Sequence, residues 1–137
     1  MSSHNRKPSI EYAVKAQVVP QSVAAAGSAS SGWVSVAQVK WAKVLALVGA
    51  GGGTLAVKLE QATDSSGTSA KDLITAANLG ITALDGTAKA AQADGDIPEN
   101  IDVDNSFAYV RVTGTVTGGS GTIVSISLEL GPQAFQS

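Results

Sequence analysis

The chain has 137 residues, of which 44% are hydrophobic and only 4% aromatic, and its formal net charge is −2. This length and hydrophobicity suit one globular domain with a core of small and β-branched side chains. The absence of cysteine excludes a disulfide, a thiolate metal site and a cysteine nucleophile. Residues 1–8 are polar and basic with no apolar segment behind them, so we expect cytoplasmic synthesis without a secretory signal or membrane anchor.

The charges are divided unevenly along the chain. Up to Lys58 there are six basic residues and one acidic residue, whereas from Leu59 onward there are three basic and ten acidic residues. Two explanations are open. Neighbouring copies, or a larger surface, could complement the two halves, or the fold could interleave the halves and cancel the field.

The first third of the chain predicts strands behind an extended arm. Residues 1–9 form the predicted arm, and apolar residues then alternate with polar ones over residues 10–18, which predicts a strand that ends before Pro20. Residues 33–39 and 41–48 predict two further short strands or one bent strand.

The middle of the chain begins with a glycine run. Residues 49–53 predict the tip of a hairpin that joins the preceding strand to an alternating strand over residues 54–61, and residues 62–69 predict a loop. The alanine-rich residues 70–93 are ambiguous. They could hold a short helix with Asp72 as its N-cap, or short strands near residues 73–74 and 81–84.

The last third predicts a second hairpin. Residues 94–105 are an acidic connector with a short strand at 97–103. Residues 107–130 then read as two alternating strands around the glycine-rich turn 117–121, with Val124, Ile126 and Leu128 on one buried face and Tyr109 on the partner strand.

Together these elements predict an all-β protein, an antiparallel β-sandwich. We expect an N-terminal arm at 1–9, the sandwich domain at 10–131 and a short C-terminal tail at 132–137.

No motif in the sequence predicts catalysis, a cofactor or a metal site. The glycines before Thr54 lack the Lys that a phosphate-binding loop needs, and an alternating strand follows them instead of a helix. The acidic residues around Pro98 do not match the calcium-loop pattern, so a solvated loop is the simpler interpretation. His4 is the only histidine and lies in the arm, where a catalytic triad could not be held rigidly. We therefore predict a protein that is not an enzyme.

Four residues are candidates for an interface. Trp33 and Trp41 are the largest side chains and could anchor an interface or stack on a sugar, while Arg6 and Lys7 give the arm its positive charge. The basic residues are too sparse for nucleic-acid binding.

Two stretches carry a family resemblance. Residues 59–68 (LEQATDSSGT) and 105–113 (NSFAYVRVT), the latter followed by a glycine-rich turn and a last hydrophobic strand, are similar to segments of small tailed-bacteriophage virion proteins of the head decoration or cement type. The resemblance covers about half of the chain, mainly residues 57–68 and 101–130. It implies a structural role in the virion and brings no catalytic residues with it.

The resemblance implies that the partners are the major capsid protein or other virion proteins. We expect many weak contacts to sum to avidity on a repeating surface. We also expect self-association, as a homotrimer, with no nucleic acid and no membrane as partner. The alternatives are a tail-tube, neck or head-fibre-base protein, and a carbohydrate-binding or adhesin module with an exposed tryptophan.

Overall fold

The computed structural model describes residues 13–36, 39–85, 90–95 and 107–132. In chain order its elements are β1 (Ala13–Val23), β2 (Ser28–Ser30), β3 (Val34–Ser35), β4 (Val39–Val48), β5 (Thr54–Ala62), β6 (Lys71–Ile74), α1 (Ala76–Leu79), β7 (Ala90–Gly95), β8 (Tyr109–Thr117) and β9 (Thr122–Pro132). The predicted all-β class is confirmed, and the only helix among these elements is a single turn.

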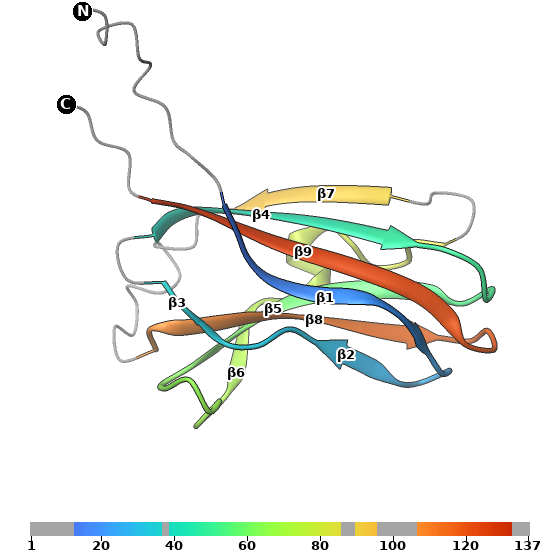
Figure 1. Cartoon of the computed structure of the whole chain (residues 1–137), viewed down its shortest axis with the longest axis horizontal. Coiled ribbons are helices and arrows are strands. Elements are labelled where there is room, and N and C mark those ends of the chain that lie inside the picture. Colours follow the sequence, from blue (N-terminus) through green and yellow to red (C-terminus); the bar gives the residue numbers. More distant parts are fainter. Residues whose placement is uncertain (1–12, 37–38, 86–89, 96–106, 133–137) are drawn as a thin grey trace, which may run out of the picture.

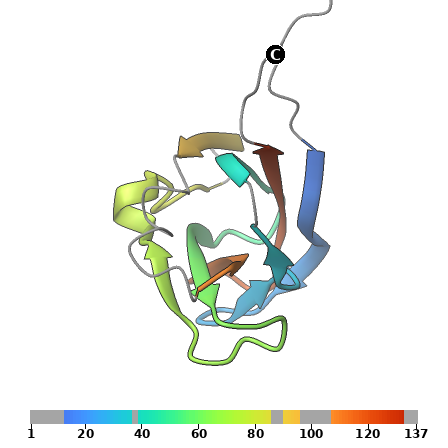
Figure 2. The same ribbon diagram turned by 90° about the vertical axis from the view of Figure 1, so that its left-hand side faces the viewer.

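The strands form two antiparallel sheets packed face to face (Figure 1). The four-stranded sheet has the order β1-β9-β4-β7, and the five-stranded sheet has the order β2-β8-β5-β6, with β3 also pairing with β8. Viewed from the end, the two sheets enclose a core, and α1 lies at the side between β7 and β5 (Figure 2). The result is the predicted antiparallel sandwich.

The core forms because each long strand has one continuous apolar face. Residues of β5 alternate strictly between half-buried and fully buried over most of the strand, and β8 and β9 do the same over much of their length. The largest fully buried side chains come from both sheets: Val18, Val44, Leu55, Val57, Leu59, Val110, Val112, Val116, Ile126, Leu128 and Leu130. Burial of such apolar surface from both inner faces is the main stabilising term of a sandwich.

The two predicted hairpins are wrong, although their strands are right. β4 pairs with β9 and β7, whereas β5 pairs with β8 and β6, so the glycines at 49–53 connect two different sheets. In the same way β8 and β9 lie in opposite sheets, and Tyr109 is not on a partner strand of β9. Among the described strands, β5 and β6 are the only consecutive pair joined by hydrogen bonds. Alternation of apolar and polar residues cannot distinguish a hairpin from a crossover between sheets, because the strands on either side of the loop have one apolar face in both arrangements.

The two glycine-rich crossovers are bonded to each other at one end of the sandwich. The Ser120 amide donates to the Gly51 carbonyl at 2.9 Å, and the Ile123 amide donates to the Ala50 carbonyl at 2.8 Å. The buried Thr122 hydroxyl accepts from the Gly53 amide at 2.9 Å. We call this contact between residues 49–53 and 118–123 the glycine clasp.

Two strand ends also differ from the prediction. β1 continues through Pro20 to Val23, because it is an edge strand and Pro20 falls in the register shift between Val18 and Gln21, where no ladder bond is required of it. At the other end, β9 continues through Gly131 and Pro132, which lie opposite Trp41 and Val39, so the tail begins later than expected.

The ambiguous alanine-rich region contains both expected kinds of structure. β6 occupies residues 71–74, and the short helix follows it. The N-cap is Thr75 rather than Asp72, since the Thr75 hydroxyl accepts from the Asn78 amide at 3.2 Å. Leu84 then forms an isolated bridge with Leu55.

Several predictions lie outside the described residues. These are the arm at 1–9, the first residues of the strand at 10–18, the strand at 97–103 and the tail from residue 133. In the described part of the chain, no helix has the length and hydropathy needed to cross a membrane.

The core assignment predicts a clear difference between neighbouring positions of β9. Ile126 is 0% exposed and faces the core, whereas Ser127 is half-buried on the opposite face. We expect Ile126→Ala to lower the free energy of unfolding by about 2–5 kcal/mol, and Ser127→Ala to change it by less than about 0.5 kcal/mol. Urea denaturation measures both, and equal losses would show that both faces of β9 are buried.

The glycine clasp predicts unequal effects for two adjacent glycines. Gly118 and Gly119 both have positive φ angles, of 74° and 77°. A Cβ on Gly119 would lie 2.4 Å from the Gly53 amide nitrogen, whereas a Cβ on Gly118 would meet nothing within 4 Å. Gly118→Ala should cost only backbone strain, about 1–2 kcal/mol, and Gly119→Ala should cost more and broaden or lower the thermal transition. Equal melting temperatures for the two variants would argue against the clasp.

Candidate functional site

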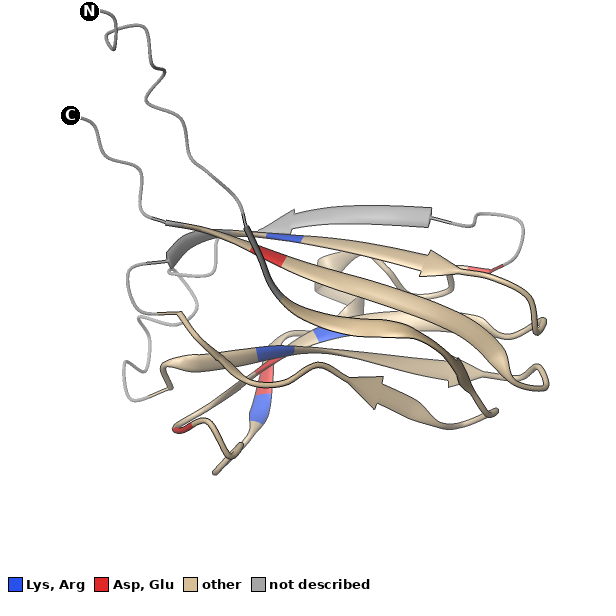
Figure 3. Cartoon of the chain, viewed as in Figure 1, with Lys and Arg blue, Asp and Glu red and all other residues tan. Residues whose placement is uncertain are grey.

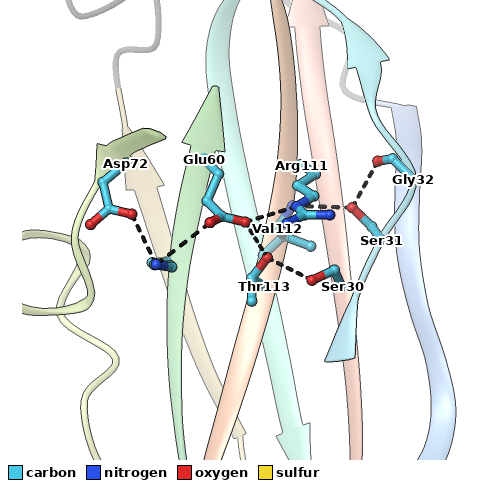
Figure 4. A network of polar contacts seen from close by, with 9 residues as sticks. Ser30, Ser31, Gly32, Glu60, Asp72, Arg111, Val112 and Thr113 are labelled. Atoms are coloured by element: carbon cyan, nitrogen blue, oxygen red, sulfur yellow. Dashed lines mark hydrogen bonds and ion pairs between the residues drawn. The ribbon is translucent and has the colours of Figure 1, made fainter. Parts of the chain in front are cut away.

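The outer face of the five-stranded sheet carries a cluster of polar and charged side chains. Its members come from strands distant in the sequence and are Ser30, Lys58, Glu60, Asp72, Arg111 and Thr113, with Trp33 beside them (Figure 4 labels all but Lys58 and Trp33). We call this set the outer-face cluster. Strand pairing brings these side chains together, since Glu60 of β5 lies opposite both Arg111 of β8 and Asp72 of β6.

Glu60 is the centre of the cluster. Its side chain is only 13% exposed. Its Oε1 accepts from Arg111 Nε at 2.8 Å and from the Thr113 hydroxyl at 2.7 Å. Because Thr113 has one hydroxyl proton and donates it to Glu60, Ser30 must be the donor in the 2.9 Å contact between the Ser30 and Thr113 hydroxyls.

These contacts keep Glu60 ionised. Burial on its own would raise the pKa of the carboxyl group, but the hydrogen bonds from Thr113 and Arg111 and the positive charges of Arg111 and Lys58 outweigh it. The pKa of Glu60 is therefore lower than its ordinary value. A carboxylate that is ionised and already hydrogen-bonded is better suited to holding strands together than to transferring protons.

Lys58 links the cluster to β6. Its Nζ lies 2.9 Å from Asp72 Oδ1 and 3.5 Å from Glu60 Oε2. The hydrogen bond to Asp72 raises the pKa of Lys58, burial opposes this, and the negative charges of Glu60 and Asp72 add to it. Lys58 belongs to the basic part of the sequence, and both of its partners belong to the acidic part. At this site the fold interleaves the two halves and cancels their charges.

Trp33 lies against the cluster from the loop before β3. The Arg111 guanidinium carbon is 4.5 Å from the centroid of the indole ring, a cation–π contact. The indole also packs on Gly67, where an added Cβ would lie 2.6 Å from Trp33 Nε1. Gly67 has a φ of +83°, so its lack of a side chain serves both the turn and the approach of the ring. Trp33 remains half-exposed.

The turn beneath Trp33 is organised by Asp64. Its Oδ1 accepts from the amides of Ser66 and Thr68 at 2.9 and 3.1 Å, and its Oδ2 accepts from the Thr68 hydroxyl at 2.7 Å. The bonds from the Thr68 hydroxyl and amide, followed by that from Ser66, hold the pKa of Asp64 below its ordinary value. This turn joins β5 to β6, so the loop predicted at residues 62–69 is present as a hydrogen-bonded hairpin connection.

Of the four predicted interface residues, the structure places Trp33 at this site. Trp33 is part of it, whereas Trp41 lies in β4 of the other sheet. The side chain of Trp41, and the whole of Arg6 and Lys7, lie outside the described residues. Their role as interface residues remains a prediction.

Sequence reasoning missed the charged centre of the cluster. A signal was present, because Lys58 and Glu60 occupy alternate positions of one strand, as Arg111 and Thr113 do of another, and such positions share a face. Their meeting across the ladder depends on the pairing of β5 with β8, which was not among the predicted strand pairs.

Chemically, the cluster is a satisfied network beside a half-exposed aromatic ring. The described residues contain no group of three or more acidic or histidine side chains that could hold a metal ion. The arrangement can present hydrogen-bonding groups and one ring to a partner.

No family model and no curated protein matches the sequence. Among solved structures, the chain is similar to a fragment described as domains C and D (11% identity, TM-score 0.41), covering 90% of this chain and 59% of the fragment. It is also similar to the module TmCBM61 in complex with β-1,4-galactotriose (16% identity, TM-score 0.40), covering 85% of this chain and 68% of the module. A third structure is CpGH89CBM32-4 from Clostridium perfringens, in complex with GlcNAc-α-1,4-galactose (15% identity, TM-score 0.37, covering 77% of this chain and 67% of the other).

The position of Glu60 predicts an acid-sensitive contribution to stability. Glu60→Ala removes the shared acceptor of Arg111 and Thr113 and should lower the free energy of unfolding by about 1–3 kcal/mol at neutral pH. Because the pKa of the folded state is depressed, the stabilisation is complete above the ordinary pKa of 4.5 and is lost as the pH falls through the lower, folded value.

The control for this prediction is Glu60→Gln, which keeps one acceptor oxygen but cannot titrate. At neutral pH, urea denaturation should show a smaller loss of unfolding free energy for Glu60→Gln than for Glu60→Ala. Over a series of pH values, the unfolding free energy of Glu60→Gln should depend less on acid than that of the wild type. An unchanged acid dependence would mean that Glu60 is not the responsible group.

Proposed function

We propose that the protein is a non-catalytic structural component of a tailed-bacteriophage virion that decorates or cements the head. The observation that carries the proposal is the relation between the two stretches with the family resemblance. Residues 59–62 pair with residues 109–112 in neighbouring strands, and Glu60 of the first stretch bonds Arg111 of the second. The two stretches thus lie side by side in one sheet. A resemblance carried by two paired strands supports the proposal better than a resemblance carried by two separate strands would.

The nature of the outer-face cluster is consistent with this role. Its charges are compensated within the chain, and Glu60 is already bonded to two donors. A structural protein needs a stable framework that presents surfaces, whereas an enzyme needs groups left available for a substrate.

Carbohydrate binding is a second candidate function, favoured by Trp33. The ring is half-exposed on an outer sheet face and lies beside the hydrogen-bonding groups of the cluster. Stacking of a sugar on an aromatic ring, with polar groups at its edge, is a common mode of recognition. One part of the ring is already occupied by Arg111 and Gly67, which leaves less of it for a ligand.

Two binding measurements distinguish the candidates. The first measurement uses particles of the virus whose genome encodes this protein, produced after the gene for the protein has been inactivated. Purified protein added back to them should cosediment and saturate at a fixed ratio to the major capsid protein. Failure to bind such particles would contradict the proposal.

The second measurement is isothermal titration with neutral oligosaccharides. We expect no binding heat. Heat that disappears in Trp33→Ala, but not in Thr115→Ala on the same sheet face, would instead establish the carbohydrate-binding function. Circular dichroism of both variants verifies that they are folded.

A further inference from the structure

The outer face of the four-stranded sheet differs from that of the five-stranded sheet. The exposed large hydrophobic side chains of the described residues are Val19 (56% exposed), Leu47 (43%) and Ile123 (39%), from β1, β4 and β9. All three strands belong to the four-stranded sheet. Apolar side chains exposed together on one face are a mark of an interaction surface.

These side chains are neighbours in the ladder. Leu47 lies opposite Ser125 of β9, and Ile123 is two residues from Ser125 on the same face. On the other side of β9, Val19 falls in the register shift between Val18, opposite Ile126, and Gln21, opposite Val124, and so lies near Ser125. We call Val19, Leu47, Ile123 and the central Ser125 the apolar patch.

Charges are sparse around the apolar patch. On this face the charged residues with described side chains are Lys43 and Glu129, which lie opposite each other on β4 and β9 (Figure 3). Leu45 and Ser127, also half-buried, separate this pair from the patch. The other sheet carries the charged members of the outer-face cluster. The described side chains of this face include no cluster of basic residues of the kind that phosphate-rich partners such as nucleic acids require.

We propose that the apolar patch is the surface through which the protein docks onto a repeating protein surface. The inference rests on the proposed virion function and specifies its contact. The partner chemistry is a weakly charged protein surface with apolar side chains that complement Val19, Leu47 and Ile123.

The size of the face favours a repeating partner over a second copy alone. Three strands spaced about 4.8 Å apart and ten residues long at about 3.4 Å per residue present roughly 500 Å². A stable pairwise complex usually buries about 800 Å² on each partner. A contact below that size is weak by itself and becomes strong when identical contacts add up on a lattice.

The β1 edge of this sheet is a poor docking site by comparison. β1 is an edge strand, but Pro20 has no amide hydrogen to donate, and a register shift interrupts the strand at the same place. Both features oppose the addition of a further strand. Docking through the face is therefore better supported than docking through the β1 edge.

Single cysteines can locate the contact, because the chain contains none of its own. Ser125→Cys places a thiol at the centre of the apolar patch, and Thr115→Cys places one at an exposed position of β8 in the opposite sheet. Each variant is labelled with a thiol reagent, first free in solution and then bound to particles that lack the wild-type protein. We expect binding to particles to abolish labelling of the Ser125→Cys variant and to leave labelling of the Thr115→Cys variant unchanged.

Substitutions give an independent measurement. Leu47→Asp introduces a charge into the patch, and Thr115→Asp introduces the same charge on the opposite face. We expect Leu47→Asp to weaken cosedimentation with particles by roughly tenfold or more, a change of ~1.4 kcal/mol in binding free energy. Thr115→Asp should bind as the wild type does, and both variants should keep the circular dichroism of the folded protein.

The outcomes separate the two proposals. If the wild-type protein does not bind particles, the virion function fails, and the docking surface fails with it. If the wild type binds particles but binding protects position 115 from labelling, or protects neither position 115 nor position 125, the virion function stands and the apolar patch is not the contact. Self-association of the free protein that Leu47→Asp abolishes would identify a second copy as the occupant instead.

Discussion

The glycine clasp is the constraint on which the rest of the sandwich depends. Residues 49–53 carry the chain from β4 to β5, residues 118–121 carry it from β8 to β9, and both crossings occur at the same end. Loops that cross between sheets leave backbone groups without ladder partners, and such groups are costly when buried. Here the loops satisfy one another, through bonds such as Ser120 to Gly51 and Gly53 to the Thr122 hydroxyl. The clasp thereby joins the two sheets at this end, in addition to the core side chains that both sheets contribute.

The two outer faces carry different kinds of side chain. On the five-stranded sheet, Glu60 joins β5 to β8, Lys58 joins β5 to β6, and the Arg111 guanidinium supports Trp33. Partly buried charges are stable only when they are paired and hydrogen-bonded, and this cluster meets that condition within one chain. The four-stranded sheet leaves apolar side chains exposed instead. The two outer faces therefore differ in chemistry, because one pairs its charges within the chain and the other exposes Leu47 and Ile123.

The proposed functions differ in which face they use. Carbohydrate binding would use Trp33 and the five-stranded sheet, whereas attachment to a particle would use the apolar patch of the four-stranded sheet. The faces lie on opposite sides of the core, so a substitution on one need not disturb the other. This separation makes the two functions experimentally distinguishable within a single small domain.

The sequence by itself determined the class of fold, the long strands β4, β5, β8 and β9 and much of the core, but not the short strands β2 and β7. Alternation placed Ile126 and Leu128 inside and Ser127 outside, because a side chain's face in a strand depends only on its position along the strand. The small and polar composition of residues 62–69 also predicted the turn that joins β5 to β6. These are local properties, which neighbouring residues decide.

Tertiary structure alone decided which strands pair, and with that the outer-face cluster, the glycine clasp and the apolar patch. A short glycine-rich loop such as 117–121 can close a hairpin or cross between sheets, and the flanking strands need the same apolar alternation in both cases. The choice follows from partners distant in the sequence, as when β9 takes β1 and β4 as neighbours in place of β8. Glu60 meets Arg111 for the same reason, because 51 residues of chain separate them and only the pairing of β5 with β8 brings them within hydrogen-bonding distance.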